Sequence, residues 1–237
     1  MNNANTVATH ASLPARVRGD LRAAADPAKA GPMRAYMKSA MPFLGVQTPT
    51  RRRVVRAALK AAPPAGAAAW AAVVTALWEA AEYREERYAA IDVLTWPKAG
   101  IFRAPAALPL MERLIVEGAW WDLVDPVATG GVGDVLRRHR RPTTRAIRAW
   151  IAQDNLWLRR AAIICQVGHK GETDLALLYA AIRANWDDRD FFIRKAVGWA
   201  LRSHAWHDPA EVKRFVHAHA DHLSPLSRRE ALKHVLA

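Results

Sequence analysis

A short sequence pattern recurs every 35 residues, and this recurrence restricts the fold more than any other feature of the chain. Residues 158–163 read LRRAAI, residues 193–198 read IRKAVG, and residues 228–232 read RREAL. The same register, extended towards the N-terminus with one step of 37, marks equivalent positions in successive units: Arg53, Tyr88, Asp125, Arg160, Lys195 and Glu230. A unit of this length cannot bury its own apolar face, so it is stable only when its neighbours stack against it.

Helical periodicity surrounds these positions, and no segment of strand length alternates between apolar and polar residues. Helices are predicted over Ala15–Ala25, Met33–Ala40, Thr50–Ala61, Ala67–Ala80, Arg84–Leu94, Ala106–Glu117, Asp122–Arg138, Thr143–Ala152, Leu156–Val167, Thr173–Ala184, Asp190–His204, Pro209–Ala220 and Ser227–Leu236. The sequence therefore predicts an all-α fold, a HEAT-like helical-repeat solenoid (an α-α superhelix), with a basic concave groove. We expect one HEAT-like repeat domain over 13–237, preceded by a flexible polar arm over 1–12.

The repeat register also predicts which side chains share a surface. Equivalent positions on the second helix of each unit line one side of a curved stack, usually the concave side. Asp125, Arg160 and Lys195 are therefore predicted to share one groove. Trp121 lies four residues before Asp125, and Trp199 lies four after Lys195, so both indoles can face that groove. The alternative is that these polar residues form only the solvated face of each helix.

The charge balance favours a polyanionic partner. Lys and Arg number 35 against 22 Asp and Glu, which gives a net charge of +13 and an isoelectric point near 10.7. Such an excess is typical of nucleic-acid binding. No run of 18 apolar residues is present, so no membrane span is expected, and the first twelve residues do not resemble a signal peptide. The only cysteine, Cys165, is predicted to lie in the core. We expect a cytoplasmic monomer.

Other patterns in the chain are given structural interpretations. Two groups of histidines are candidate metal ligands: His217, His219 and His222, and His204 with His207. His217 and His219 point to different helix faces, and no thiolate or carboxylate set joins them at a known spacing, so no metal site is predicted. The glycines of 130–133 do not follow a strand, and they favour close helix packing over phosphate binding. Asp122 is predicted to be a helix N-cap. Packing roles are assigned to Trp70, Trp78, Trp120, Trp150, Trp157 and Trp206.

Six blocks of the chain together carry a resemblance to a known family. They are residues 33–38 (MRAYMK), 43–49 (FLGVQTP), 120–125 (WWDLVD), 154–162 (DNLWLRRAA), 191–199 (FFIRKAVGW) and 225–231 (PLSRREA). In order and spacing, from about Ala15 to the C-terminus, the chain resembles the HEAT-repeat alkylpurine DNA glycosylases, the AlkD-like DNA alkylation repair family. The Trp-Trp-Asp and Gly-Trp blocks are the most specific. The polar N-terminal arm and the alanine richness depart from the family pattern.

The resemblance implies hydrolysis of the N-glycosidic bond of cationic N3- and N7-alkylated purines in duplex DNA, without rotation of the base out of the duplex. It makes Asp125 the catalytic carboxylate, and it makes Trp121 and Trp199 the aromatic walls at the lesion sugar. It places Tyr36, Arg160 and Gln47 on DNA-contact positions. The groove register adds Lys195 to the predicted DNA-binding residues.

Elementary chemistry supports this assignment. A purine alkylated at N3 or N7 already carries positive charge and leaves as a neutral base, so one carboxylate can suffice where most glycosidases use two. An anion and two indole faces stabilise an oxocarbenium-like sugar, and neither a metal nor an organic cofactor is required. Two other classes stay open: a non-catalytic HEAT-repeat scaffold that binds damaged or branched DNA, and a protein-binding solenoid. The complete set of Trp121, Asp125 and Trp199 favours the enzyme.

Overall fold

The computed structural model describes the backbone of residues 3–235 and the side chains of residues 13–235, in two compact units. The N-terminal unit ends at Arg103, and the C-terminal unit begins at Ala104. All regular elements in the described residues are helical, so the predicted all-α fold is confirmed. None of the described helices is both long and apolar enough to cross a membrane.

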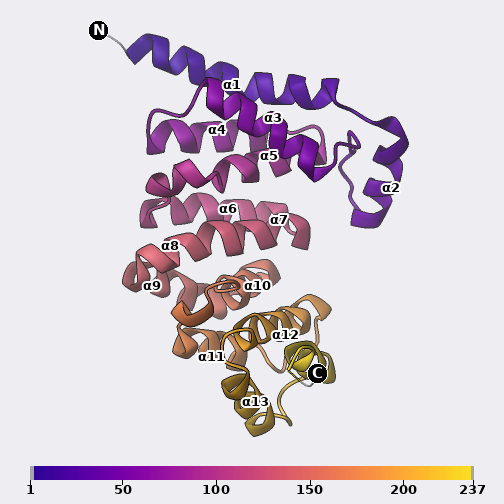
Figure 1. Cartoon of the computed structure of the whole chain (residues 1–237), viewed down its shortest axis with the longest axis vertical. Coiled ribbons are helices and arrows are strands. Elements are labelled where there is room, and N and C mark those ends of the chain that lie inside the picture. Colours follow the sequence, from indigo (N-terminus) through magenta and orange to yellow (C-terminus); the bar gives the residue numbers. More distant parts are fainter. Residues whose placement is uncertain (1–2, 236–237) are drawn as a thin grey trace. The chain divides into compact units, whose positions relative to one another are not determined.

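The N-terminal unit is built around a pair of antiparallel helices, α4 and α5, with α1 and α3 packed beside them (Figure 1). Two tryptophans of this core, Trp70 and Trp78, are each 1% exposed, as predicted, and the Nε1 of Trp70 donates to the carbonyl of Val93 at 3.1 Å. The elements of the unit are α1 (Asn3–Ala23), α2 (Pro27–Met37), α3 (Thr48–Ala61), α4 (Ala67–Glu79), α5 (Arg84–Leu94) and a 3-10 helix, η1 (Pro97–Phe102).

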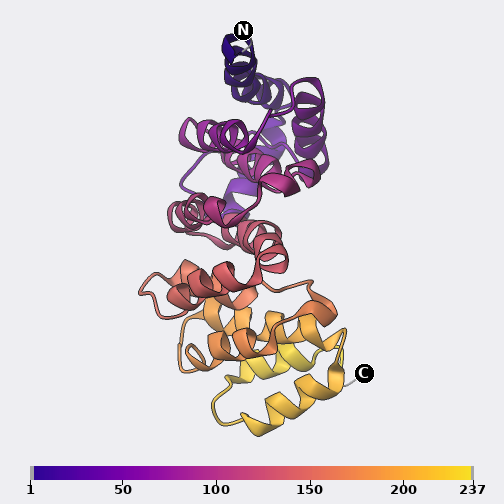
Figure 2. The same cartoon turned by 90° about the vertical axis from the view of Figure 1, so that its left-hand side faces the viewer.

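The C-terminal unit stacks its helices in chain order. Helix α10 packs on α7, α12 packs on α10, and α14 packs on α12. Figure 2 shows the last two of them, α12 and α14, in adjacent layers. The elements are η2 (Pro105–Ala107), α6 (Leu108–Gly118), α7 (Trp121–Pro126), η3 (Val127–Val132), α8 (Gly133–Arg138), α9 (Arg140–Ile151), α10 (Leu156–Ile164), η4 (Lys170–Glu172), α11 (Leu175–Arg183), α12 (Phe191–Ala205), α13 (Pro209–Ala218) and α14 (Pro225–Leu232). This neighbour-to-neighbour packing confirms the HEAT-like prediction, whereas the basic concave groove stays a prediction.

Three predicted boundaries differ from the structure by more than a turn, and one of them is the end of α14 at Leu232 rather than Leu236. Helix α1 begins at Asn3 rather than Ala15, and α2 spans Pro27–Met37 rather than Met33–Ala40. Helix α2 buries none of its residues, so it has no apolar stripe from which its bounds could be read. Of the predicted flexible arm, residues 1 and 2 lie outside the described residues; its flexibility, like the single domain over 13–237, stays a prediction.

Two of the remaining core predictions are confirmed, and one is wrong. Trp150 is buried in α9, and the Cys165 thiol is fully buried at the end of α10, as predicted. Trp206 is 72% exposed, so its assignment to the core was wrong. It stands at the C-cap of α12, one position past the last helical residue.

Candidate active site

The Trp-Trp-Asp segment forms the start of an interrupted helix. Helix α7 begins at Trp121, with Trp120 at the cap position, so the prediction that Asp122 is the N-cap was wrong. Asp122 lies instead in the first turn, where its negative charge faces the positive end of the helix dipole. Directly after Pro126 the helix widens into the π-helical segment η3, and the hydroxyl of Thr129 donates to the carbonyl of Asp125 at 2.8 Å.

A glycine sets how closely this helix approaches α10. A Cβ atom added at Gly133 would lie 2.3 Å from the carbonyl oxygen of Cys165, at the end of α10. No side chain fits at this point without movement of a backbone. The predicted role of the glycine run in close helix packing is therefore confirmed at Gly133, and this contact holds α8 and the preceding α7 against α10.

The carboxylate of Asp125 meets the guanidinium of Arg160 in a two-pronged ion pair. The Nε of Arg160 donates to Oδ1 of Asp125 at 2.8 Å, and its Nη2 donates to Oδ2 at 2.7 Å. A third nitrogen, Nη1, donates to the carbonyl of Phe192 in α12 at 2.7 Å. The side chains are only 14% (Asp125) and 5% (Arg160) exposed. One guanidinium therefore joins α7, α10 and α12.

Burial dominates the electrostatics of this pair. It raises the pKa of Asp125 above its ordinary value of 3.8, because the charged form loses solvation. The hydrogen bonds and the charge of Arg160 oppose that rise, and the nearby negative charge of Asp122 adds to it. An anion held in this way is poorly solvated, so it interacts more strongly with a cation that approaches than an exposed carboxylate would.

The two tryptophans predicted to act with Asp125 lie in the same unit and keep part of their surface exposed. Trp121 is half-buried one helical turn before Asp125, and Trp199 is half-buried in α12, one turn after Lys195. Neither indole stacks on another ring or on a cation among the described residues. Their π faces are therefore not covered by such partners from the described part of the chain.

A cluster of other aromatic residues supports the helices that carry the ion pair. Trp120, Trp157 and Phe192 have ring centroids 5.0–6.0 Å apart, and they come from the segments that begin α7, α10 and α12. The prediction that Trp120 and Trp157 pack is confirmed. Phe192 lies with its ring 5.9 Å from the Arg160 guanidinium carbon, and its neighbour Phe191 is 52% exposed.

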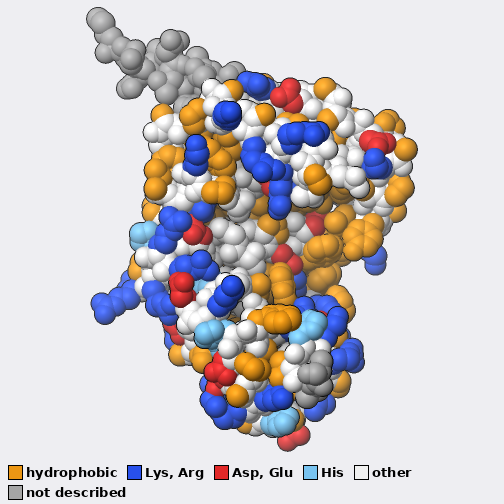
Figure 3. Space-filling view, viewed as in Figure 1, with side chains coloured by type: hydrophobic (Ala, Val, Ile, Leu, Met, Phe, Trp, Pro, Cys, Tyr) orange, Lys and Arg blue, Asp and Glu red, His pale blue; other side chains and the backbone are white. Residues whose placement is uncertain are grey.

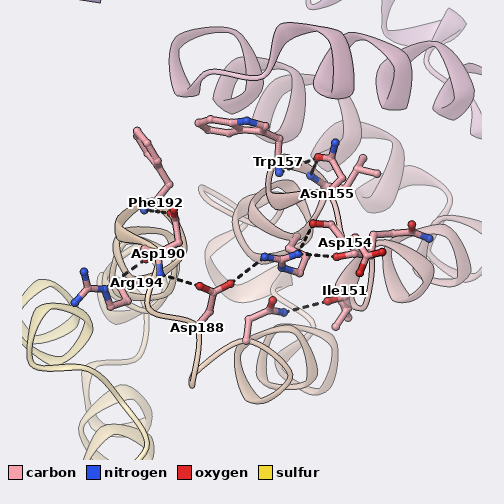
Figure 4. Close-up of polar contacts among 12 residues, drawn as sticks. Ile151, Asp154, Asn155, Trp157, Asp188, Asp190, Phe192 and Arg194 are labelled. Atoms are coloured by element: carbon pink, nitrogen blue, oxygen red, sulfur yellow. Dashed lines mark hydrogen bonds and ion pairs between the residues drawn. The ribbon is translucent and has the colours of Figure 1, made fainter. Parts of the chain in front are cut away.

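Polar caps fix the starts of α10 and α12. The side chain of Asn155 accepts the backbone N–H groups of Trp157 and Leu158, and that of Asp190 accepts the N–H of Phe192 at 2.6 Å (Figure 4). Asp188 accepts the N–H of Asp190 at 2.8 Å and also pairs with Arg159 at 2.9 Å. These bonds tie the loop before α12 to α10, and so they set where the Phe192 carbonyl meets Arg160.

A second ion pair lies at the next step of the repeat. Lys195 Nζ of α12 contacts Glu230 Oε1 of α14 at 2.7 Å, and Arg202 pairs with the other carboxylate oxygen. Glu230 and Lys195 are 35 residues apart, as are Asp125 and Arg160. The predicted register therefore describes real contacts in the C-terminal unit. In the N-terminal unit the cation beside Tyr88 is Arg51, at 4.9 Å, two residues before the predicted Arg53.

Gly198 allows the close approach of α12 and α14. A Cβ atom added there would lie 2.5 Å from the Cβ of Glu230 and 2.9 Å from the carbonyl oxygen of Ser227. The glycine of the Gly-Trp block is therefore required by packing, and it brings Glu230 within reach of Lys195. Trp199 follows it on the same helix.

The remaining predicted DNA-binding residues belong to the N-terminal unit. Tyr36, near the end of α2, is 75% exposed, and Gln47 is exposed immediately before α3. Contact with DNA stays a prediction for both, as it does for Lys195. For Arg160, three of its nitrogens are already bonded within the protein.

Three residues of the site environment were given no role from the sequence. Phe192 supplies a carbonyl to Arg160, and Glu230 and Arg202 complete the ion pair of Lys195. Phe192 lies within the FFIRKAVGW block, and Glu230 occupies one of the register positions. The signal that could have found the pairs is opposite charge at a spacing of one repeat.

The histidines assigned no metal role have other neighbours. The ring of His222 stacks on Trp186 at 4.2 Å, and His219 lies 5.4 Å from the same indole. Within residues 13–235 no group of three or more His, Cys, Asp or Glu side chains is arranged to hold a metal ion.

The family model described as "DNA alkylation repair enzyme" matches residues 17–235. The chain therefore belongs to the DNA alkylation repair enzyme family. It is similar to the solved structure of a predicted DNA alkylation repair enzyme from Enterococcus faecalis, with a TM-score of 0.73 and 29% sequence identity over 89% of this chain and 96% of that one. No curated protein matches the chain.

Proposed function

We propose that this protein is a monofunctional DNA glycosylase that hydrolyses the N-glycosidic bond of cationic N3- and N7-alkylated purines in duplex DNA. The observation that carries the proposal is the Asp125 carboxylate, shielded from solvent, held at both oxygens by Arg160, and one helical turn from the half-exposed indole of Trp121. This is an anion of fixed position beside an aromatic face, which is suited to stabilising a cation.

The reaction needs no acid for the leaving group. When the bond between C1′ and the purine nitrogen breaks, its electron pair neutralises the positive base, and positive charge develops on the deoxyribose. Asp125 stabilises that charge, assisted by the π faces of Trp121 and Trp199. A water molecule then adds its oxygen to C1′ and releases a proton, and Asp125 orients that water. The products are the free neutral base and an abasic sugar.

Arg160 leaves Asp125 able to perform this task. Each carboxylate oxygen accepts one N–H from Arg160 and retains a further lone pair. The guanidinium also favours the ionised form, which opposes the effect of burial on the pKa of Asp125. Because that pKa is nevertheless raised, excision should decline on the acid side at a pH above the ordinary Asp value of 3.8.

DNA binding is assigned to the cationic surface. A net charge of +13 favours a polyanion, and Tyr36, Gln47 and Lys195 are the proposed contacts. Arg160, the fourth predicted contact, bonds within the protein through three of its nitrogens. We further propose that the lesion stays within the duplex, so that the sugar and backbone approach Asp125 without base flipping, and that the protein acts as a monomer.

A specific observation supports a second candidate, a non-catalytic scaffold that binds damaged or branched DNA. Both oxygens of Asp125 are already bonded to Arg160, as they would be in an ion pair that only joins two repeats. The half-exposed Trp121 and Trp199 favour the enzyme, because a purely structural pair does not need accessible indoles beside it.

Release of base from methylated duplex DNA separates the two candidates. Purified protein should liberate 7-methylguanine and 3-methyladenine, measured by chromatography of the soluble fraction, and Asp125→Asn should not. DNA binding by the wild-type protein without release of either base would leave the scaffold as the function.

A further inference from the structure

Helix α2 is the least embedded helix of the N-terminal unit. None of its eleven residues is buried, and it carries the exposed Tyr36. Its ends are capped locally: the side chain of Asp26 accepts the N–H of Ala28, and the C-cap residue Lys38 adopts a left-handed conformation with φ of 49°. Local caps define a helix but do not fix its position, so another contact must hold α2 on the unit.

That contact is the loop that leads from α2 to α3. The N–H of Asp26 donates to the carbonyl of Leu44 at 2.9 Å, just before the first turn of α2. Gly45 sits against the same turn with φ of +83°, and a Cβ atom there would lie 2.0 Å from the carbonyl oxygen of Asp26. The loop and the start of α2 are therefore in backbone contact, and only glycine satisfies both the conformation and the space.

A buried carboxylate ties this loop to α5, beside a backbone bond from the N–H of Arg84 to the carbonyl of Pro42 at 2.9 Å. Glu85, in the first turn of α5, has no solvent exposure. Its oxygens accept the backbone N–H groups of Leu44, Gly45 and Val46 at 3.0, 2.9 and 3.0 Å. A buried charge is tolerated only with such compensation, and hydrogen bonds to an ionised acceptor are among the stronger ones. Glu85 therefore links the core helix α5, through the loop, to the position of α2.

The segment that this link positions is positively charged, as DNA-binding surfaces are. Between residues 27 and 78 the sequence has eight Lys and Arg residues and no Asp or Glu. Figure 3 shows several of these cationic side chains over α3. Arg51 is nearly buried and pairs with Asp92 at 2.7 Å, and the other seven are exposed: Lys29, Arg34, Lys38, Arg52, Arg53, Arg56 and Lys60. Tyr36 of α2 and Gln47, which follows the clamped loop directly, belong to the same stretch.

We propose that Glu85 is a positioning residue for DNA binding. By clamping the 43–46 loop, it fixes α2 and Gln47 so that Tyr36 and the acid-free stretch 27–61 dock on the phosphate backbone of duplex DNA. The inference rests on the proposed function for its partner. It assigns Glu85 no part in bond cleavage, because Asp125, Trp121 and Trp199 lie in the other unit. Loss of the clamp should change DNA affinity and leave the chemical step at saturating DNA unchanged.

The full-length chain provides a matched control. Glu86, the next residue, is equally buried, but it accepts from Arg22, Glu82 and Tyr83 and does not bond to the 43–46 loop. Glu85→Gln keeps the shape and turns one acceptor into a donor that faces the N–H of Leu44. We expect amide hydrogen exchange of residues 27–37 to accelerate in Glu85→Gln and not in Glu86→Gln. Unchanged exchange in Glu85→Gln would overturn the clamp.

Measurements of DNA binding test whether Glu85 acts through Tyr36. On a fluorescent undamaged duplex, Glu85→Gln should weaken binding by about tenfold, the equivalent of one hydrogen bond's net worth. The double variant Glu85→Gln/Tyr36→Ala should bind no more weakly than the weaker single variant, because released α2 no longer presents Tyr36. Single-turnover excision at saturating DNA should match wild type. Additive losses, or a slower chemical step, would overturn the positioning role.

A second variant disturbs the same contact by a substitution in the loop. Gly45→Ala should reproduce both the exchange and the binding result, whereas Gly31→Ala, whose added methyl meets nothing within 4 Å, should not. This pair decides the question even if Glu85→Gln does not fold. If wild type binds DNA with the predicted coupling but releases no alkylated base, the proposed glycosylase fails while the clamp stands.

Discussion

The C-terminal unit contains two ion pairs of the same spacing that differ in environment. Asp125–Arg160 and Lys195–Glu230 each join residues 35 apart on helices that pack side by side. In the first pair the acid comes earlier in the chain and both partners are nearly buried. In the second the base comes earlier, and Lys195 is 39% exposed. The repeat places both pairs, and the burial of the cation makes them differ.

The difference appears in the direction of the pKa shift of each acid. Burial raises the pKa of Asp125 against the effect of one cation. Hydrogen bonding from Lys195 lowers the pKa of Glu230, with a further contribution from Arg202, and burial opposes them only in part. A poorly solvated anion with one cationic partner is suited to meeting a transient cation, whereas an anion with two cationic partners is suited to joining helices.

Arg160→Ala should have the largest effect on stability. It leaves the Asp125 carboxylate buried without a partner, which typically costs about 3–5 kcal/mol. Urea denaturation should show this loss, and Lys195→Ala, which removes the more exposed cation, should lose less than about 1 kcal/mol. Equal losses in the two variants would remove the distinction between the pairs.

The same variant tests the predicted phosphate contact of Arg160. Removal of a phosphate contact would reduce the magnitude of the slope of log binding constant against log salt concentration by about one unit. Since three nitrogens of Arg160 are bonded inside the protein, we expect the slope to stay as in wild type. A reduced slope would restore Arg160 to the DNA-binding residues.

Asp125→Asn should have the largest effect on excision. It keeps the shape of the side chain and removes the charge, and loss of one preorganised electrostatic partner costs about 3–4 kcal/mol, or about 10²–10³ in rate. Single-turnover release of 7-methylguanine measures the effect, with duplex binding measured in parallel and expected to be retained. Glu230→Gln is the matched acid of the second pair and should excise as wild type does; similar losses in both would make Asp125 a structural residue.

Gly198→Ala tests the packing that supports the second pair. The added methyl would overlap the Cβ of Glu230 and the backbone at Ser227, so we expect a loss of about 1–3 kcal/mol in the free energy of unfolding. Gly19→Ala in α1 meets nothing within 4 Å and should be neutral or stabilising by about 0.5–1 kcal/mol. A neutral Gly198→Ala would mean that α12 and α14 separate without cost.

The smallest expected effect is a pH dependence. Because the pKa of Glu230 is lowered in the folded state, its ion pairs contribute stability that is present above the ordinary value of 4.5 and lost as pH falls through the folded-state pKa. Urea denaturation from pH 7 to 3 should therefore show a smaller acid loss in Glu230→Gln than in wild type, by less than about 1 kcal/mol given the exposure of Lys195. If the free energy of unfolding falls equally in both proteins as the pH is lowered, the loss of stability in acid belongs to other carboxylates.

Periodicity in the sequence predicted the helices that bury an apolar stripe. Helix α5 was predicted with its observed bounds, and α3, α10 and α12 began within two residues of prediction. Helix α2 buries nothing and was displaced by six residues at its start, because periodicity reports burial rather than helix formation itself. Trp206 failed for a related reason, since the pattern continued past the helix end.

The repeat register predicted less of the site than of the fold. It placed Asp125 beside Arg160, and Lys195 in line with Glu230, because equivalent positions of stacked helices face each other. It could not show that the two partners of each pair bond directly, since that depends on side-chain length and on the close approach allowed at Gly133 and Gly198. The clamp by Glu85 joins segments 40 residues apart through backbone groups, which leave no side-chain pattern to read.

The spacing of the ion pairs also determines where the chain can tolerate insertions. A helix turns by about 100° per residue, so one residue inserted in α10 ahead of Arg160 would swing its guanidinium away from Asp125, whereas the same insertion in the loop before α10 would not. The π-helical segment η3 follows this rule. Its wider turn begins at Val127, after Asp125, so the side chain ahead of it keeps its direction. Insertions in related chains should accordingly collect between helices or downstream of the paired residue.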